Sequence, residues 1–180
     1  PSARDVLDGG TPCLDVVELR CTPGPLPLAL ARNAGAQHAL SAGADLLIFL
    51  DVDCVPGAGL VQRYLQVAAG EEQPTVLCGP VSYLPPPPAA GYQLAALPGL
   101  GRPHPARPVP PEAGIQPGGE HDLFWSLSFA VRAQLWRELG GFCEQYHGYG
   151  GEDTDFGQLA ASRGIALTWV GGAWAYHQYH

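Results

Sequence analysis

The stretch 45–54 constrains the fold more than any other part of the chain. Residues 46–50 are five consecutive apolar residues, and Asp51 and Asp53 follow them before a Pro-Gly turn at 56–57. An apolar run of this length, bounded by polar and turn residues, is typical of a strand buried on both faces. Such strands place ligand-binding residues at their carboxyl ends. Because residues two apart on an extended chain point to the same side, Asp51 and Asp53 can converge on one cation.

Around this strand, the apolar pattern predicts helices that alternate with strands. Further strands are expected at 14–19, 76–78, 81–84, 127–131 and 165–169. Helices are expected at 28–42, from Pro56 to Gly70, at 132–139 and at 154–163. The alternation in 127–131 indicates a strand buried on one face only. Helices alternating with strands favour a layered α/β architecture, and we expect residues 1–180 to form one domain.

The segment 85–119 has a different composition. Residues 85–88 are four consecutive prolines, and nine more Pro or Gly residues lie between Gly91 and Pro111. Prolines remove backbone donors, so this segment is predicted to be a long, largely irregular loop. Loops of this length in a compact domain are usually functional or mobile, and an inert insertion is the alternative.

Composition and charge exclude several classes of function. The net charge of −8 argues against a nucleic-acid groove, which needs clustered Lys and Arg. No apolar run approaches eighteen residues, so no transmembrane segment is expected. The five cysteines show no C-x-x-C spacing and favour reduced thiols in a cytosolic protein: Cys13, Cys21, Cys54, Cys78 and Cys143. The chain contains no Met, which favours an internal or trimmed piece of a longer protein.

A second acidic motif follows a glycine-rich approach. Gly148, Tyr149, Gly150 and Gly151 lead directly into Glu152-Asp153-Thr154-Asp155. Helix capping and the helix dipole explain one or two acids at a helix start. They do not explain the glycines, which allow a backbone to pass close to a ligand. An exposed carboxylate at such a place can serve as a general base.

Two histidines lie at the end of the last expected strand. His177 and His180 are three residues apart, and on an extended strand they point in different directions, so we expect only one of them to act. An imidazole can complete a metal site made of carboxylate, phosphate and water. Carboxylate ligands favour Mg²⁺ or Mn²⁺ over zinc.

Four motifs together resemble the family 2 glycosyltransferases of the GT-A fold. They are Leu-Ala-Arg-Asn-Ala-Gly at 30–35, Phe-Leu-Asp-Val-Asp at 49–53, Gly-Gly-Phe at 140–142 with Gly-Glu-Asp-Thr-Asp at 151–155, and a terminal His. The resemblance covers residues 14–180. It implies a GT-A-like α/β fold with a mostly parallel central sheet flanked by helices, lacking or truncated at its N-terminal strand.

The resemblance implies a donor site for a nucleotide-sugar, such as a UDP- or GDP-sugar. Arg32 and Asn33 would lie beside the nucleotide, and Asp51 would lie near the ribose and the sugar. Asp53 would bind a divalent cation, Mn²⁺ or Mg²⁺, on the diphosphate. His177 would be the later metal ligand, with His180 the less favoured choice.

The resemblance also implies an acceptor site for a carbohydrate or another hydroxyl compound. Asp153 would be the base that deprotonates the acceptor, and Glu152, also within the catalytic motif, would help to hold it, beside Gly151. Trp125 and Tyr149 are candidates for an apolar platform on which a sugar ring stacks. Core packing is the alternative for both aromatic residues.

The expected function is therefore an inverting, metal-dependent glycosyltransferase, in which the segment 85–119 can close over the donor. Two alternatives stay open: a non-catalytic sugar- or metal-binding module on the same fold, and a sugar nucleotidyltransferase. The expected location is the cytoplasm, with the inner face of the membrane as a further option.

Overall fold

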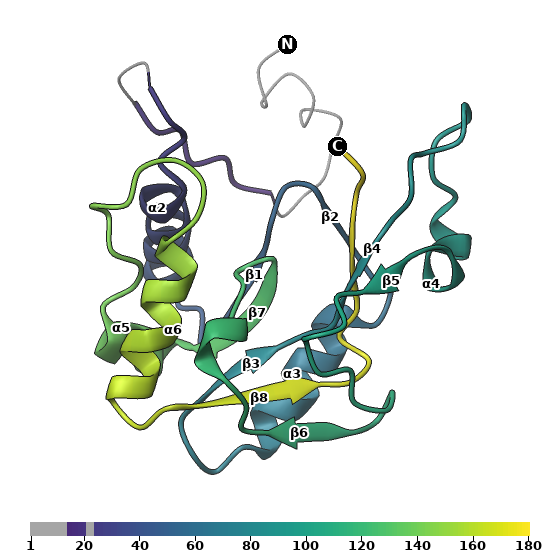
Figure 1. Ribbon diagram of the computed structural model, residues 1–180. Coiled ribbons are helices and arrows are strands. Elements are labelled where there is room, and N and C mark those ends of the chain that lie inside the picture. The colour runs from purple at the N-terminus through teal and green to yellow at the C-terminus, as the bar shows by residue number, and fades with distance from the viewer. Residues whose placement is uncertain (1–13, 21–23) are drawn as a thin grey trace.

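A computed structural model describes residues 14–20 and 24–180 and shows a five-stranded sheet between two helical layers (Figure 1). Three helices cover one face: α2 (Leu28–Ser41), α5 (Ala133–Leu139) and α6 (Glu152–Ser162). The opposite face is covered by α3 (Leu60–Gly70). These four helices confirm the helices predicted from the sequence, to within a few residues at their ends.

The strand order of the larger sheet is β1-β7-β3-β8-β6. The strands are β1 (Leu46–Leu50), β3 (Thr75–Cys78), β6 (Ile115–Pro117), β7 (Ser128–Arg132) and β8 (Ala166–Val170). Only β3 and β8 pair in parallel, and the other three pairs are antiparallel.

The α/β architecture is as expected, but the mostly parallel pairing is not. Strands β1, β3 and β8 run the same way, while β7 runs in the opposite direction between β1 and β3. The reason is that β7 begins where β1 ends, with Ser128 paired to Leu50. A parallel strand would need a crossover that returned the chain to the other end of the sheet.

A smaller sheet brings the end of the chain to the carboxyl end of β1. Its strand order is β2 (Cys54–Pro56), β9 (Ala175–His177), β4 (Val81–Tyr83) and β5 (Arg102–Pro103). Cys54 pairs with His177, and the backbone N–H of Gln178 donates to the carbonyl of Asp53 at 2.8 Å. In Figure 1 the C-terminus accordingly lies beside the turn that joins β1 and β2.

The core has two parts, one on each face of the larger sheet. Leu47 and Phe49 of β1 pack with the α2, α5 and α6 layer, and Ile48 packs with the α3 layer, so the predicted two-sided packing of β1 is confirmed. The prediction that β7 is buried on one face only is wrong. Residues 128–131 are all buried, because β7 lies inside the sheet with both faces covered.

One other expectation needs correction. Residues 14–19 do not form a strand. The segment 85–119 is largely irregular, as predicted, and it also contains a 3-10 turn, η1 (Leu94–Ala96), and the short helix α4 (Leu97–Leu100), followed by β5 and β6. Unlike proline, Ile115 and Gln116 of β6 keep the backbone N–H that strand pairing needs. Strand β6 therefore pairs with β8 and extends the edge of the larger sheet.

The connection between β6 and β7 contains a further 3-10 turn, η2 (His121–Leu123).

Within the described parts of the chain, no helix has the length and apolar character needed to cross a membrane.

Candidate functional site

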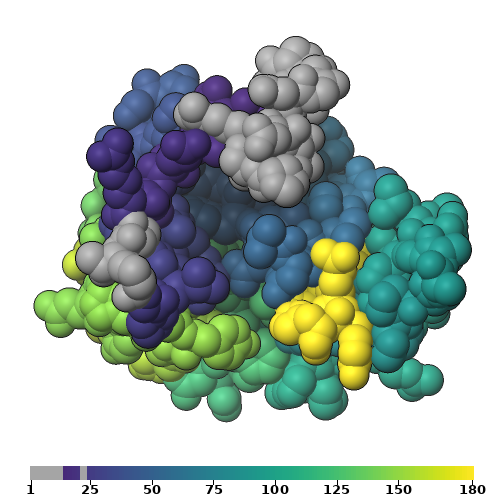
Figure 2. Space-filling view, turned by 90° about the horizontal axis from the view of Figure 1, so that it is seen from above, coloured from purple at the N-terminus to yellow at the C-terminus, as the bar shows by residue number. Residues whose placement is uncertain are grey.

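The sequence-predicted residues gather at the carboxyl end of β1. This face is hollowed at its centre, with α2 (purple to blue) on one side and the C-terminal residues (yellow) on the other (Figure 2). Two groups of charged side chains lie near the end of β1. Arg32 with Asp51 and Glu152 forms the first, and Asp53 with the histidines forms the second.

Arg32, on α2, binds both acidic motifs. Its Nη2 donates to Asp51 Oδ1 at 2.7 Å, and its Nη1 donates to Glu152 Oε1 at 2.9 Å. The guanidinium also lies 5.4 Å from the ring centroid of Phe142. Because Asp51 and Glu152 are far apart in sequence, Arg32 fixes the start of α6 relative to the end of β1. The resemblance implied that Arg32 lies beside the nucleotide; in the structure its charge is committed within the protein.

The acids around Arg32 keep it charged. Burial lowers the pKa of the guanidinium, but the hydrogen bonds and charges of Asp51 and Glu152 outweigh this effect and raise it above its usual value. Burial raises the pKa of Asp51, and the hydrogen bond from Arg32 opposes that rise. Glu152 is only 3% exposed, and its Oε2 has no hydrogen-bond partner among the described residues. Glu152 therefore joins the start of α6 to Arg32.

Asn33 is also committed to the protein. Its side chain accepts from the backbone N–H of Phe142 and donates to the carbonyl of Phe142, both at 2.9 Å, and it donates to Glu144 as well. The Asn33 side chain can lie this close to the backbone of Phe142 only because residue 141 is a glycine. A Cβ at Gly141 would lie 2.7 Å from Asn33 Oδ1. Asn33, expected beside the nucleotide, thus joins α2 to the segment that leads into α6.

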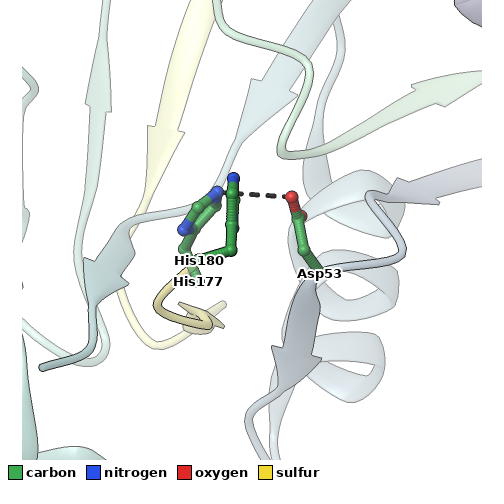
Figure 3. A group of neighbouring side chains, drawn as sticks. All are labelled: Asp53, His177 and His180. Atoms are coloured by element: carbon green, nitrogen blue, oxygen red, sulfur yellow. Dashed lines mark ion pairs between the residues drawn. The ribbon is translucent and has the colours of Figure 1, made fainter. Parts of the chain in front are cut away.

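Asp53, His177 and His180 form a cluster that fits a divalent cation (Figure 3). One ligand atom from each lies within 4.8 Å of the others, and His177 Nε2 is 3.5 Å from Asp53 Oδ2. Asp53 Oδ1 is buried and has no hydrogen-bond partner in the described parts of the chain. One carboxylate and two imidazoles are a ligand set that Mn²⁺ accepts.

The expectation that only one histidine can point to the site does not hold. The ring centroids of His177 and His180 are 5.0 Å apart, and both rings face Asp53. Strand β9 ends at His177, so the alternation of an extended strand does not extend to His180. Beyond the strand, Tyr179 N–H donates to the hydroxyl of Tyr92. The sequence gives no sign of where the strand ends, so it did not predict that His180 would lie beside His177 and Asp53.

The acceptor-side candidates lie at the start of α6. Gly151 precedes the helix with φ +94°. A Cβ at Gly151 would lie 2.9 Å from the ring of Tyr146, which is too close. Asp153 is partly exposed, and its Oδ1 accepts from the N–H of Thr154 at 2.8 Å. Tyr149 is 97% exposed and does not belong to the core, so core packing does not explain it.

Trp125, in the connection between η2 and β7, is partly exposed. The ring of His104 meets it edge to face at 4.8 Å, and the guanidinium of Arg107 lies 5.3 Å from its ring centroid. The sequence gave no reason to single out Arg107, because an isolated arginine in a Pro-rich segment has no distinguishing pattern.

Comparisons with known proteins show what the chain is similar to. Residues 118–180 match a family model described as the N-terminal domain of galactosyltransferase. This match covers the second acidic motif and both histidines.

Two bacterial relatives are named validoxylamine A glucosyltransferase, from Streptomyces hygroscopicus subsp. jinggangensis (strain 5008) and subsp. limoneus. Each is 29% identical over 184 aligned residues, which cover 85% of this chain. The alignments cover 39% and 37% of the two relatives, so the chain spans about two fifths of their length.

A solved structure, GalNAc-T7 with UDP, GalNAc and Mn²⁺, has a TM-score of 0.56 to this chain at 16% identity. The match covers 83% of this chain and 30% of that one. The GT-A-like α/β fold is therefore confirmed. The comparisons support a GT-A glycosyltransferase, and they do not confirm family 2.

Proposed function

We propose that this chain carries the donor site of a glycosyltransferase, which moves a sugar from a nucleotide-sugar to an acceptor hydroxyl. The observation that carries the proposal is the cluster of Asp53, His177 and His180 beside the carboxyl end of β1. The names of the bacterial relatives and the UDP and Mn²⁺ bound to the structural neighbour support it. The three cysteines Cys54, Cys78 and Cys143, which are free, agree with a cytoplasmic location.

On the donor side, we assign Asp53 and the two histidines to a divalent cation, Mn²⁺ or Mg²⁺. When bound, the cation supplies positive charge against the departing diphosphate. Asp51 is held by Arg32 with its carboxylate partly exposed, which leaves it able to accept hydrogen bonds from the ribose and the sugar. A donor with a uridine or guanosine diphosphate is the class we expect.

On the acceptor side, we assign Asp153 as the general base. Its partial exposure and the hydrogen bond from Thr154 N–H leave a fixed carboxylate facing solvent at the start of α6. A carboxylate there can remove the acceptor proton as the acceptor oxygen attacks the face opposite the leaving group, which inverts the anomeric centre. Tyr149 and Trp125 would stack on the sugar ring, and Gly151 would lie beside the acceptor.

The ion pairs of Arg32 serve this chemistry indirectly. Glu152 precedes Asp153 and is held by Arg32, which also holds Asp51. The donor carboxylate and the base are thereby built on one rigid unit, and small errors of position are costly in reactions of this kind. Arg32 and Glu152 are positioning residues in this proposal.

The test is a transfer assay of the full-length protein with UDP- and GDP-sugars and a panel of hydroxyl acceptors. Asp153→Asn should keep UDP binding and lose transfer by about 100-fold or more. Asp155→Asn is the matched control, because it removes the same charge from the same turn of α6.

Three results would contradict the proposal. Unchanged turnover by Asp153→Asn would exclude it as the base. Donor binding without transfer or donor hydrolysis by the wild type would favour a binding module. Formation of a nucleotide-sugar from a sugar phosphate would favour a nucleotidyltransferase.

A further inference from the structure

Arg107, in the segment between β5 and β6, is a buried cation without a hydrogen-bond acceptor. Its residue exposure is 6%, and its Nε, Nη1 and Nη2 are all buried. Within residues 14–20 and 24–180, none of these three atoms has a hydrogen-bond partner. An unpaired buried charge is costly, and proteins keep few of them.

Two tryptophan rings lie beside the Arg107 guanidinium. Its Cζ lies 5.3 Å from the ring centroid of Trp125 and 5.1 Å from that of Trp169. Cation–π attraction to two rings offsets part of the cost of burial. The N–H donors of a guanidinium all lie in one plane. That geometry suits a planar, two-point contact with an oxyanion.

The surroundings of Arg107 join the two halves of the site. Burial lowers its pKa, and the groups that oppose this are the thiol of Cys78, the hydroxyls of Tyr83 and Tyr64, and the carboxylate of Asp153. Asp153 is the only carboxylate in that set. On the other side, the ring of Tyr83 lies 5.1 Å from the ring of His177. The charge of Arg107 therefore acts on the proposed base and on Tyr83, which lies beside the proposed metal cluster.

Within the described parts of the chain, no carboxylate forms an ion pair or a hydrogen bond with Arg107. The Oδ1 of Asp153 accepts from Thr154 N–H, and Arg32 binds Asp51 and Glu152. A bound anion can therefore supply the negative charge that pairs with Arg107.

We propose that Arg107 is an oxyanion-binding residue of this site, and that its partner is a phosphate oxygen of a diphosphate ligand. The proposal rests on the proposed function, which brings a diphosphate to the neighbouring metal cluster. Since the guanidinium nitrogens have no contact with solvent, the partly exposed ring of Trp125 must shift for the oxyanion to enter. Without ligand, the guanidinium of Arg107 lies beside the two rings and has no hydrogen-bond acceptor. It gains an acceptor only when the ligand is bound.

The test measures binding by calorimetry, with Mn²⁺ present, for UDP, inorganic pyrophosphate and uridine. Arg107→Met should weaken UDP and pyrophosphate about tenfold or more and leave Mn²⁺ binding unchanged. Arg107→Lys should lose less, because it keeps the charge without the planar fork. Arg102→Met is the matched control, since Arg102 is an exposed arginine of the same segment. It should bind all ligands as the wild type does.

Thermal unfolding separates this role from a structural one. Without ligand, Arg107→Met should unfold at the same or a higher temperature than the wild type, because it removes an unpaired buried charge. With UDP and Mn²⁺, the wild type should gain stability and Arg107→Met should gain much less. A variant that is less stable without ligand, and binds UDP as tightly as the wild type, would overturn the proposal.

Other outcomes identify which proposal fails. Equal wild-type affinity for UDP and uridine would exclude the phosphate contact and overturn the role of Arg107 alone. A wild type that binds neither UDP nor pyrophosphate would overturn both this role and the proposed function. A wild type that binds UDP through Arg107 but transfers no sugar would keep the oxyanion site and overturn the transferase.

Discussion

Two arginines at this site differ in what surrounds them. Arg32 lies on α2 and is partly buried, and it binds Asp51 at 2.7 Å and Glu152 at 2.9 Å. Arg107 is buried in a Pro-rich connection beside two tryptophan rings, and its nitrogens have no acceptor among the described residues. A charge with its partners in place stabilises the fold, whereas an unpaired buried charge destabilises it. On this difference we propose that Arg32 positions the site and that Arg107 binds a ligand.

The largest expected effect is on stability at Arg32. Arg32→Met leaves Asp51 and Glu152 without their cation in a mostly buried place, and it should lower the free energy of unfolding by about 3 kcal/mol. Urea unfolding followed by circular dichroism measures this loss. Arg107→Met serves as the comparison and should cost little. Equal losses in the two variants would break the distinction between scaffold and binding arginine.

The next effect is on the metal. Asp53→Asn or His180→Ala should weaken Mn²⁺ binding by about 100-fold, because each removes one of three ligands from the cluster. Calorimetric titration with Mn²⁺ measures this effect. His104→Ala is the control, because His104 is exposed and lies outside the cluster. If His180→Ala binds Mn²⁺ normally while His177→Ala does not, only His177 is a ligand.

A smaller effect is expected at Asn33, the other polar link between α2 and the segment before α6. Asn33→Ala leaves the N–H and carbonyl of Phe142 without their side-chain partner, which should cost about 1–2 kcal/mol in the free energy of unfolding. Gln37→Ala, an exposed change on the same helix, should cost a few tenths. A loss at Asn33 no greater than at Gln37 would show that this link adds no stability.

The smallest effect concerns alkaline pH and the region around Arg107. Burial raises the pKa of the Cys78 thiol to about 12, and the charge of Arg107 opposes that rise. The unfolded chain releases this proton near the usual thiol value, so folding stability falls as pH rises from about 9 towards 12. At one pH unit above the unfolded value, the loss from this group is about 1.4 kcal/mol.

Cys78→Ala removes the contribution of this thiol. The variant should show a shallower decline of stability between pH 9 and pH 11 than the wild type, in urea titrations at fixed pH. Arg32→Met should leave that slope unchanged, because Arg32 is not among the groups that affect Cys78. A parallel decline in the wild type and in Cys78→Ala would exclude Cys78 as the cause.

Local patterns were enough to predict much of the fold. The apolar run of β1 and the helical periodicity of α2 and α3 depend on neighbours in sequence, and the structure has all three. The direction of β7 was missed because it depends on where a long connection delivers the chain. The edge strand β6 was missed for a related reason, since a three-residue strand that ends in Pro117 gains its pairing only from β8.

The candidate site divides in the same way. Asp51, Asp53 and Asp153 stand in motifs with a recognisable spacing, so the sequence pointed to them. His180 lies near Asp53, and Arg107 lies near Trp169. These residues are far apart in sequence, and no local pattern records those contacts. Arg32 was singled out as part of a motif, but its partners Asp51 and Glu152 appear only in the folded chain.

The most direct test of the central claim is a crystal structure of the protein with Mn²⁺ and UDP, with anomalous scattering data that locate the metal. We predict one Mn²⁺ peak bounded by the carboxylate of Asp53 and the imidazoles of His177 and His180, with the diphosphate of UDP on its open side. UDP bound elsewhere, or a Mn²⁺ peak without contact to Asp53, would contradict the account.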